Sequence, residues 1–426
     1  MSPVPPAVPP DHDRRNRFLL NLAVVIAVGM VAHVFRSSTA VVAPDIIGEL
    51  GLAAGWAAYL TSGFFAAAMI VQIPVGIMYD AVGLRVTIPL MLGIAAAGAV
   101  VFATAEGAAA LLVGRILMGV GAGALIMGGL VLCARWLPPE RFPALVGMVL
   151  ALSQVGNIGA TAPVAIVAAA LGWRGAFLCL AALALLIALV YLLRIEEYPP
   201  EAPRAAAARE GFAASVRGSL RILCNRELWP VFAMAFVSYA VNFSVAGVWG
   251  GVYLSEVFGF DVVMRGYFLL LMASAFALGL VFFGWLGQKL RSLKRAVLAG
   301  SGVSAALFLL AALVPDPSPV AVGGFFLLLG AAGGACGTII PHGRNFYPSG
   351  SIGRGVTVLN TIVLLGALAV QISTGLLMDI LFGAGMDASA AFRVLFATHA
   401  CALVTGMLVY SRARETAPET EAAAAM

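Results

Sequence analysis

The chain has 426 residues, of which 62% are hydrophobic and 11% are charged, with a formal net charge of +5 at pH 7. A soluble domain of this size could not bury so much apolar surface, so a mean hydropathy of +1.01 excludes a soluble globular protein and indicates an integral membrane protein. The basic residues gather beside the apolar segments, so nucleic acid is not expected as a partner.

Long apolar segments recur along the chain, rich in Ala, Leu and Gly and without the alternation of a membrane strand. They predict an all-α membrane protein with 12 transmembrane helices, embedded in the lipid bilayer. The expected spans are residues 18–42, 53–78, 85–105, 108–133, 143–170, 174–193, 228–254, 264–287, 296–314, 319–342, 355–381 and 390–411.

The longest interruption between spans is charged and carries several prolines, which predicts a linker between two halves of the chain. Related halves of six helices are typical of secondary transporters, with a substrate site between them near the membrane midplane. The expected organisation is a tail (1–17), an N-terminal six-helix bundle (18–194), a cytoplasmic linker (195–227), a C-terminal six-helix bundle (228–411) and a second tail (412–426).

The basic residues also predict the orientation of the chain in the membrane. If the N-terminus lies inside, most of the 25 Lys and Arg residues fall in cytoplasmic segments. Arg174, Arg265 and Arg393 fall on the outer side, and Arg36 and Arg115 lie within the membrane. We therefore expect a multi-pass protein of a bacterial inner membrane with both termini in the cytoplasm.

The first span reads VAHVFRSSTAVVAP over residues 31–44 and carries two basic side chains, His33 and Arg36. A charge at the centre of a membrane helix costs about 2.5–3.5 kcal/mol on insertion scales and normally faces a partner or a watery cavity. The acidic residues lie in loops or near span ends, so Arg36 has no evident counter-ion within the chain. The guanidinium fork therefore suits an anion. The alternative is a structural arginine that pairs with helix carbonyls or extends to the membrane surface.

His33 precedes Arg36 by about one helical turn and shares its face. It could donate to the same anion or carry a coupling proton, since no carboxylate is expected at mid-span. The alternative is a histidine that is hydrogen-bonded within the helix packing.

The loop between spans two and three reads GIMYDAVGLR, with Gly76, Asp80, Gly83 and Arg85 at fixed spacing. It resembles the loop motif of the major facilitator superfamily, whose role is to latch the two halves at the cytoplasmic side. Arg344, at the cytoplasmic end of span ten, is expected to belong to the same gate.

The interval from Arg36 to Pro44 in span one is similar to that of the anion:cation symporters in this superfamily. The resemblance implies that Arg36 binds a substrate carboxylate, although Phe35 stands where that family usually has Asp.

Spans four and five carry further candidates. RILMGVGAG resembles the span-four motif of the superfamily, which implies a role for Arg115 in proton coupling; a surface-directed arginine is the alternative. GMVLALSQVGNIGA matches the glycine spacing of drug–proton antiporters, but Asn157 replaces their proline. Gln154 and Asn157 share a face and could bind substrate or a neighbouring helix.

Span seven reads FVSYAVNFSVAGVWGGVY, in which Tyr239, Asn242, Ala246 and Trp249 fall at helical spacing. They predict one wall of a cavity, although Tyr and Trp also suit a lipid-facing surface. In span eleven Gln371 is the deeper polar candidate.

These features predict a secondary active transporter of a small anionic solute, an organic acid or similar, coupled to protons and acting by alternating access as a monomer. No ATP-binding loop, metal cluster or nucleophile arrangement is visible, so neither an enzyme nor a cofactor is expected. Three alternatives stay open: an efflux antiporter of apolar compounds, a carrier of iron chelates or other bulky anions, and a non-transporting assembly factor or sensor.

Overall fold

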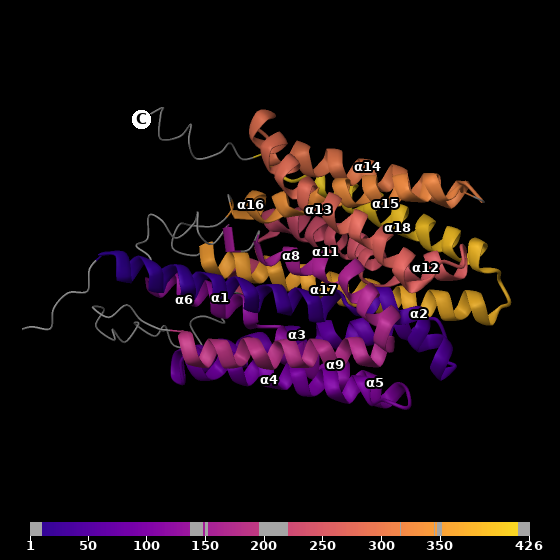
Figure 1. Cartoon of the computed structure of the whole chain (residues 1–426). Coiled ribbons are helices and arrows are strands. Elements are labelled where there is room, and N and C mark those ends of the chain that lie inside the picture. Colours follow the sequence, from indigo (N-terminus) through magenta and orange to yellow (C-terminus); the bar gives the residue numbers. More distant parts are fainter. Residues whose placement is uncertain are drawn as a thin grey trace, which may run out of the picture.

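The computed structural model describes residues 11–136, 148–149, 152–195, 220–315, 317–344, 346 and 352–415. Regular structure in these ranges is helical throughout (Figure 1). The helices of the first half are α1 (Asp11–Ser37), α2 (Thr39–Leu50), α3 (Trp56–Ala81), α4 (Leu84–Ala103), α5 (Ala108–Ala122), α6 (Leu125–Trp136), α8 (Val155–Gly159) and α9 (Ala162–Arg194).

The second half begins with the short 3₁₀ helix η1 and contains the π-helical segment η2 and the 3₁₀ segment η3. Its elements are η1 (Arg226–Leu228), α11 (Trp229–Ser244), η2 (Val245–Trp249), α12 (Gly250–Glu256), α13 (Val262–Lys289), α14 (Leu293–Leu313), α15 (Pro319–Gly333), η3 (Gly334–Thr338), α16 (Ile339–Arg344), α17 (Ile352–Gly383) and α18 (Ala388–Tyr410).

These elements account for the twelve predicted spans. In the described part of the chain, 10 helical stretches are long and apolar enough to cross a membrane, and α3 adds a shorter apolar stretch, Trp56–Gln72. The remaining span is hidden in α9, because Gly172 adopts φ 72° and ψ 168° and separates the end of span five from span six. The backbone geometry of Gly172 suits a residue without Cβ. The predicted linker lies mostly outside the described residues, so the domain boundaries stay predictions.

Several helix starts are fixed by side chains just before them. Asp261, Ser292, Ser318 and Asp387 each accept a hydrogen bond from the backbone N–H three residues later, at the starts of α13, α14, α15 and α18. Such caps satisfy N–H groups that a helix cannot pair internally. The turns between spans are therefore well specified by sequence.

The first span is longer than predicted and is broken once. The helix stops at Ser37, resumes at Thr39 and continues past Pro44 to Leu50, whereas the sequence predicts an end at residue 42. Proline has no N–H to offer the carbonyl of Ala40. A Cβ at Gly251 of α12 would lie 1.9 Å from that carbonyl oxygen, so the glycine lets the two bundles meet closely there.

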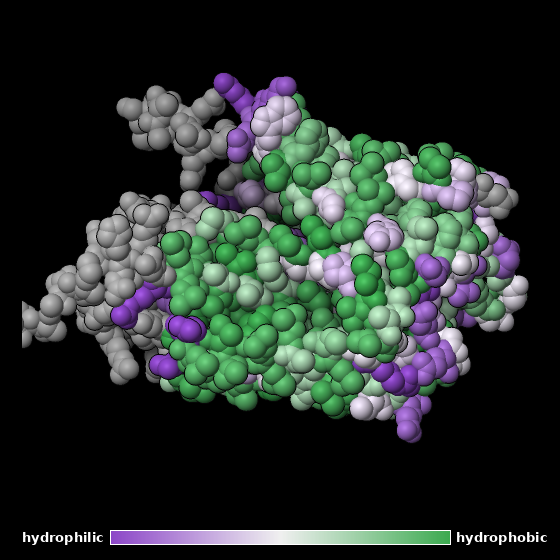
Figure 2. Space-filling view, in the orientation of Figure 1, coloured by the Kyte–Doolittle hydropathy of each residue, from purple (hydrophilic) through white to green (hydrophobic). Residues whose placement is uncertain are grey.

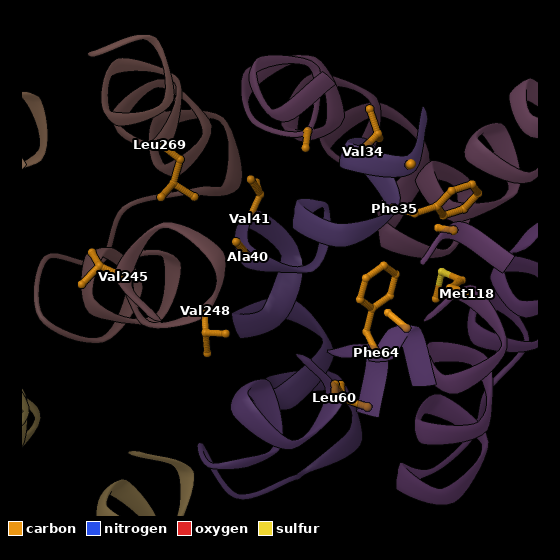
Figure 3. Packing of buried hydrophobic residues seen from close by; sticks show 14 of the residues in the cluster. Val34, Phe35, Ala40, Val41, Leu60, Phe64, Met118, Val245, Val248 and Leu269 are labelled. Carbon is orange, nitrogen blue, oxygen red and sulfur yellow. The ribbon is translucent and has the colours of Figure 1, made fainter. Parts of the chain in front are cut away.

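The lateral surface is apolar and the core is packed from both halves. Figure 2 shows hydrophobic residues over the side of the described chain and hydrophilic residues gathered towards its ends. Figure 3 shows Phe35, Phe64 and Met118 together inside the first bundle, while Val41 of α2 lies on the side that faces Val248 of the second. The chain is a multi-pass membrane protein with lipid-facing sides.

Two acidic side chains join the bundles at the distal end, which is the end opposite the first turns of α1 in Figure 1. Asp45 of α2 forms an ion pair with Arg265 of α13, whose side chain is 3% exposed. Asp379 of α17 accepts hydrogen bonds from the backbone N–H of Gly55 and from the hydroxyl of Tyr59, both at 2.8 Å. We call this set the distal latch: Asp45, Arg265, Gly55, Tyr59 and Asp379.

We predict that replacing both carboxylates of the distal latch, Asp45→Asn with Asp379→Asn, opens the distal end. The buried Arg265 guanidinium then loses its ion-pair partner, which destabilises the closed arrangement and shifts the ratio of open to closed molecules by about tenfold or more. Electron-spin distances between labels at Leu171→Cys and Val320→Cys, with native cysteines replaced by alanine, measure the opening. Glu106→Gln, an exposed change elsewhere at the same end, serves as the control. An unchanged distance distribution in the double variant would contradict the role of the latch.

Candidate functional site

A cavity between the two bundles contains the side chain of Arg36. It encloses about 640 Å³ of space not filled by protein atoms, part of it open to solvent. The first bundle supplies a polar wall, from the end of α1 and from the segment around α8: Arg36, Ser37, Gln154, Asn157 and Thr161. The structure thus brings Arg36, Gln154 and Asn157 together, as the sequence predicts.

A chain of hydrogen bonds connects the polar wall. Arg36 donates to Nδ1 of His33 and, at 3.4 Å, to Oδ1 of Asn157. The same oxygen accepts from the Ser37 hydroxyl at 3.0 Å, and Nδ2 of Asn157 donates to Oε1 of Gln154 at 2.9 Å. An arginine has donors and no acceptor, so Nδ1 of His33 must carry no proton in this arrangement.

The charge of Arg36 is not neutralised by a described side chain. Its hydrogen-bond partners, His33 and Asn157, are neutral, and its Nε is buried without a partner. The carboxylate of Asp379 is held in the distal latch and accepts its hydrogen bonds there. The ring of Phe243, 5.8 Å from the guanidinium carbon, adds a weak attraction. The cavity therefore has an excess positive charge and a free donor.

A close helix contact positions Asn157 beside Arg36. A Cβ at Gly156 would lie 2.1 Å from the carbonyl oxygen of Met30 in α1, so any side chain there would force the two segments apart. This contact explains one glycine of the span-five pattern. The other, Gly147, lies outside the described residues.

Arg115 lies beneath the cavity rather than in it. It is fully buried and donates to the backbone carbonyls of Phe35 at 2.8 Å, Arg36 at 3.3 Å and Leu60 at 3.3 Å. The carbonyls near the break after Ser37 need such partners, because a helix end leaves carbonyls unpaired. Arg115 thus holds the backbone that carries Arg36, and it does not extend to the membrane surface. Its role in proton coupling stays a prediction.

The second bundle supplies the opposite wall, which is mostly apolar. It consists of Tyr239, Asn242, Phe243 and Ala246 from α11 and η2, of Leu269, Met272, Ala273 and Phe276 from α13, and of Leu329 from α15. The Tyr239 hydroxyl and Oδ1 of Asn242 are buried without a partner. The α13 residues could not be recognised as a cavity wall from sequence, because apolar side chains at i, i+3, i+4 and i+7 look like an ordinary packing face.

Three of the residues predicted to bind substrate do not line this cavity. His33 is connected to it through its hydrogen bond with Arg36. Trp249 is fully buried and donates to the Thr374 hydroxyl at 2.9 Å, and Gln371 is fully buried with its amide unpaired. Helical spacing predicts that Trp249 follows Tyr239, Asn242 and Ala246 on one face. The π turn from Val245 to Trp249 uses more residues per turn than an α-helix, so it rotates Trp249 away.

The loop motif is described in part. Gly83 has φ 95° and turns the chain into α4, as its spacing predicts. Gly76 is exposed, and a Cβ added there would meet nothing within 4 Å, so no helix of the described chain packs closely against it. Arg85 is exposed and donates to the Leu192 carbonyl of its own bundle at 3.2 Å. The side chain of Asp80 lies outside the described part of the chain, and Arg344 is exposed at the end of α16.

Comparison with known proteins gives a family match and two curated relatives. The model of the Major Facilitator Superfamily matches residues 25–370. A probable sulfoacetate transporter, SauU from Cupriavidus necator, is 25% identical over 269 residues, which cover 61% of this chain and 62% of that protein. The hexuronate transporter of Bacillus subtilis is 25% identical over 173 residues, or 41% of each chain. The chain thus matches less than two thirds of the length of either relative.

Solved structures share the fold at low identity. A bacterial homolog of the human lysosomal transporter Spinster, in an inward-facing and occupied conformation, has a TM-score of 0.73 at 19% identity, covering 92% of this chain and 96% of that one. The nucleoside transporter NupG has a TM-score of 0.74 at 12% identity, covering 92% and 99%. These similarities support two bundles of six helices.

We predict that Arg115→Met destabilises the protein. The carbonyls of Phe35 and Arg36 would lose their donors inside the membrane, at a cost of about 1–3 kcal/mol for each buried unpaired group. The melting temperature of the purified protein in detergent should fall by roughly 5 °C or more. Arg85→Met, which removes an exposed arginine with one backbone hydrogen bond, is the matched control and should change it little. Equal melting temperatures for both variants would contradict the structural role of Arg115.

Proposed function

The chain belongs to the major facilitator superfamily, and from that premise we propose that it is a secondary transporter of a small anionic solute. Membership in a transporter family agrees with the prediction that the chain is not an enzyme. We propose a monomer in a bacterial inner membrane with both termini in the cytoplasm. The distal end is then the outer face, and the distal latch closes the route from outside.

The proposal is carried by the Arg36 guanidinium, which lines the cavity without a carboxylate partner among the described residues. Burying an unpaired charge is costly, so a site of this kind is stabilised by a ligand of opposite sign. An anion can accept from Arg36 and from the Ser37 hydroxyl, while Gln154 and Asn157 supply amide groups around it.

The names of the curated relatives support an anionic cargo. Sulfoacetate and hexuronates are both small organic anions, although these relatives are matched over part of their length. An efflux antiporter of apolar compounds would gain nothing from an uncompensated guanidinium in its cavity. The cavity therefore favours the anion among the alternatives that the sequence leaves open.

We propose that His33 links anion binding to proton uptake. While Arg36 donates to Nδ1 of His33, that nitrogen cannot hold a proton. An anion that takes over the Arg36 donor frees Nδ1 and adds a negative charge nearby, and both changes favour protonation of the imidazole. Anion and proton would then bind together, as symport requires.

We predict that Arg36→Gln reduces uptake of anions into proteoliposomes by about 100-fold or more, because the charge and the fork of donors are both lost. The variant keeps an amide of similar length, so the protein should remain folded, as judged by its melting temperature and gel-filtration profile. Arg36→Lys should retain part of the flux, since it keeps the charge and loses the fork. Wild-type flux in a folded Arg36→Gln protein would remove the anion proposal.

We predict that His33→Gln separates binding from coupling. Glutamine can still accept from Arg36 through Oε1 but cannot take up a proton. Anion binding should change less than about threefold, whereas stimulation of uptake by an inward-acid gradient should disappear. Stimulation of the same size in the variant would exclude His33 as the sole proton carrier.

A further inference from the structure

We infer that the cavity selects a monoanion with one charged end and a mainly hydrocarbon or aromatic body. This inference rests on the proposed function, in which Arg36 binds the anionic group. It adds the shape of the rest of the cargo, which follows from the two unlike walls of the cavity.

The cavity offers the cargo one fixed positive charge, and His33, which takes up the proposed coupling proton, lies outside the cavity lining. Arg36 is the single charged side chain among the described residues that line the cavity. Arg115 of α5 is a second positive charge, but it is fully buried and donates its hydrogen bonds to backbone carbonyls. Among the described residues that line the cavity, a second anionic group on the cargo would find no further positive charge, and burying it unpaired is unfavourable.

The wall opposite Arg36 suits an apolar body. Leu269, Met272, Ala273 and Phe276 present one face of α13 to the cavity, and Phe243 adds an aromatic ring from α11. Thioether and aromatic side chains make favourable contacts with hydrocarbon and aromatic groups. A cargo held by Arg36 at one end would extend its other end across the cavity towards this wall.

Few polar groups remain for the body of the cargo. The Tyr239 hydroxyl and Oδ1 of Asn242 are unpaired on this wall, and Nδ2 of Asn242 already donates to the Ser238 carbonyl at 2.9 Å. These two groups can satisfy one or two hydroxyls. A body with a hydroxyl on every carbon would leave several of them desolvated and unpaired, which is how apolar pockets reject polar ligands.

Four probes of stated chemistry test the inference with the full chain in lipid nanodiscs, by titration calorimetry. They are phenylacetate, its neutral analogue phenylacetamide, the polyhydroxylated monoanion glucuronate and the dianion sulfoacetate. We expect phenylacetate to bind about tenfold or more tightly than glucuronate and sulfoacetate. Binding of phenylacetamide should be undetectable, and Arg36→Gln should abolish binding of phenylacetate.

The outcomes distinguish this inference from the proposed function. If glucuronate or sulfoacetate binds as tightly as phenylacetate and the binding depends on Arg36, the selection of an apolar body is wrong and anion transport stands. If no anion binds in a manner that depends on Arg36, both proposals fail.

Variants of the α13 wall give a second, independent readout. Phe276→Asn should weaken phenylacetate binding about tenfold and leave glucuronate binding equal or tighter, because it replaces aromatic surface with an amide. Phe276→Leu, which keeps the wall apolar, is the matched control and should weaken phenylacetate binding less than about threefold. Equal phenylacetate affinity in Phe276→Asn and wild type, with both proteins folded, would overturn the contact between cargo and wall.

Discussion

A guanidinium in the middle of a membrane protein with neutral partners is the constraint on which the site depends. Arg36 is surrounded by an imidazole, an amide and an aromatic ring, and none of them cancels its charge. Water can screen this charge and an anion can neutralise it. Both need an opening between the bundles at this depth in order to reach Arg36. The cavity and the amide network around it leave the Arg36 charge accessible to water and to an anion.

The backbone that presents Arg36 is itself unusual. The helix breaks after Ser37, resumes at Thr39 and runs on past Pro44. Arg115 from α5 supplies donors to the carbonyls of Phe35 and Arg36. The two arginines therefore have different roles. Arg115 stabilises the main chain, and Arg36, which that main chain carries, faces the cavity. The membrane tolerates such irregular backbone where it is buried in protein or lines a cavity.

The helical spans could be predicted well from sequence because each one is long and apolar, and the chain must satisfy its backbone internally in lipid. Arg36 could be singled out because a charge in an apolar run is conspicuous, whereas the spacing of Gln154 and Asn157 left substrate binding and helix packing both open. The position of Trp249 outside the cavity could not be predicted, because no pattern in the sequence indicates the π turn that rotates it away from Asn242. The apolar wall from α13 could not be predicted either. Unlike Arg36, Leu269 and Phe276 are residues that any packed helix face would contain.

Asp379 has two roles, because it joins the bundles and also accepts a hydrogen bond from the N–H of the residue that precedes α3. Gly55 has no side chain to cap that helix, and a Cβ there would collide with the carboxylate at 2.4 Å. One bundle thus supplies the acceptor for the N–H of the residue that caps a helix in the other. Separation of the bundles would take the acceptor away from the Gly55 N–H and from the Tyr59 hydroxyl together, so opening at this end must supply both groups with water.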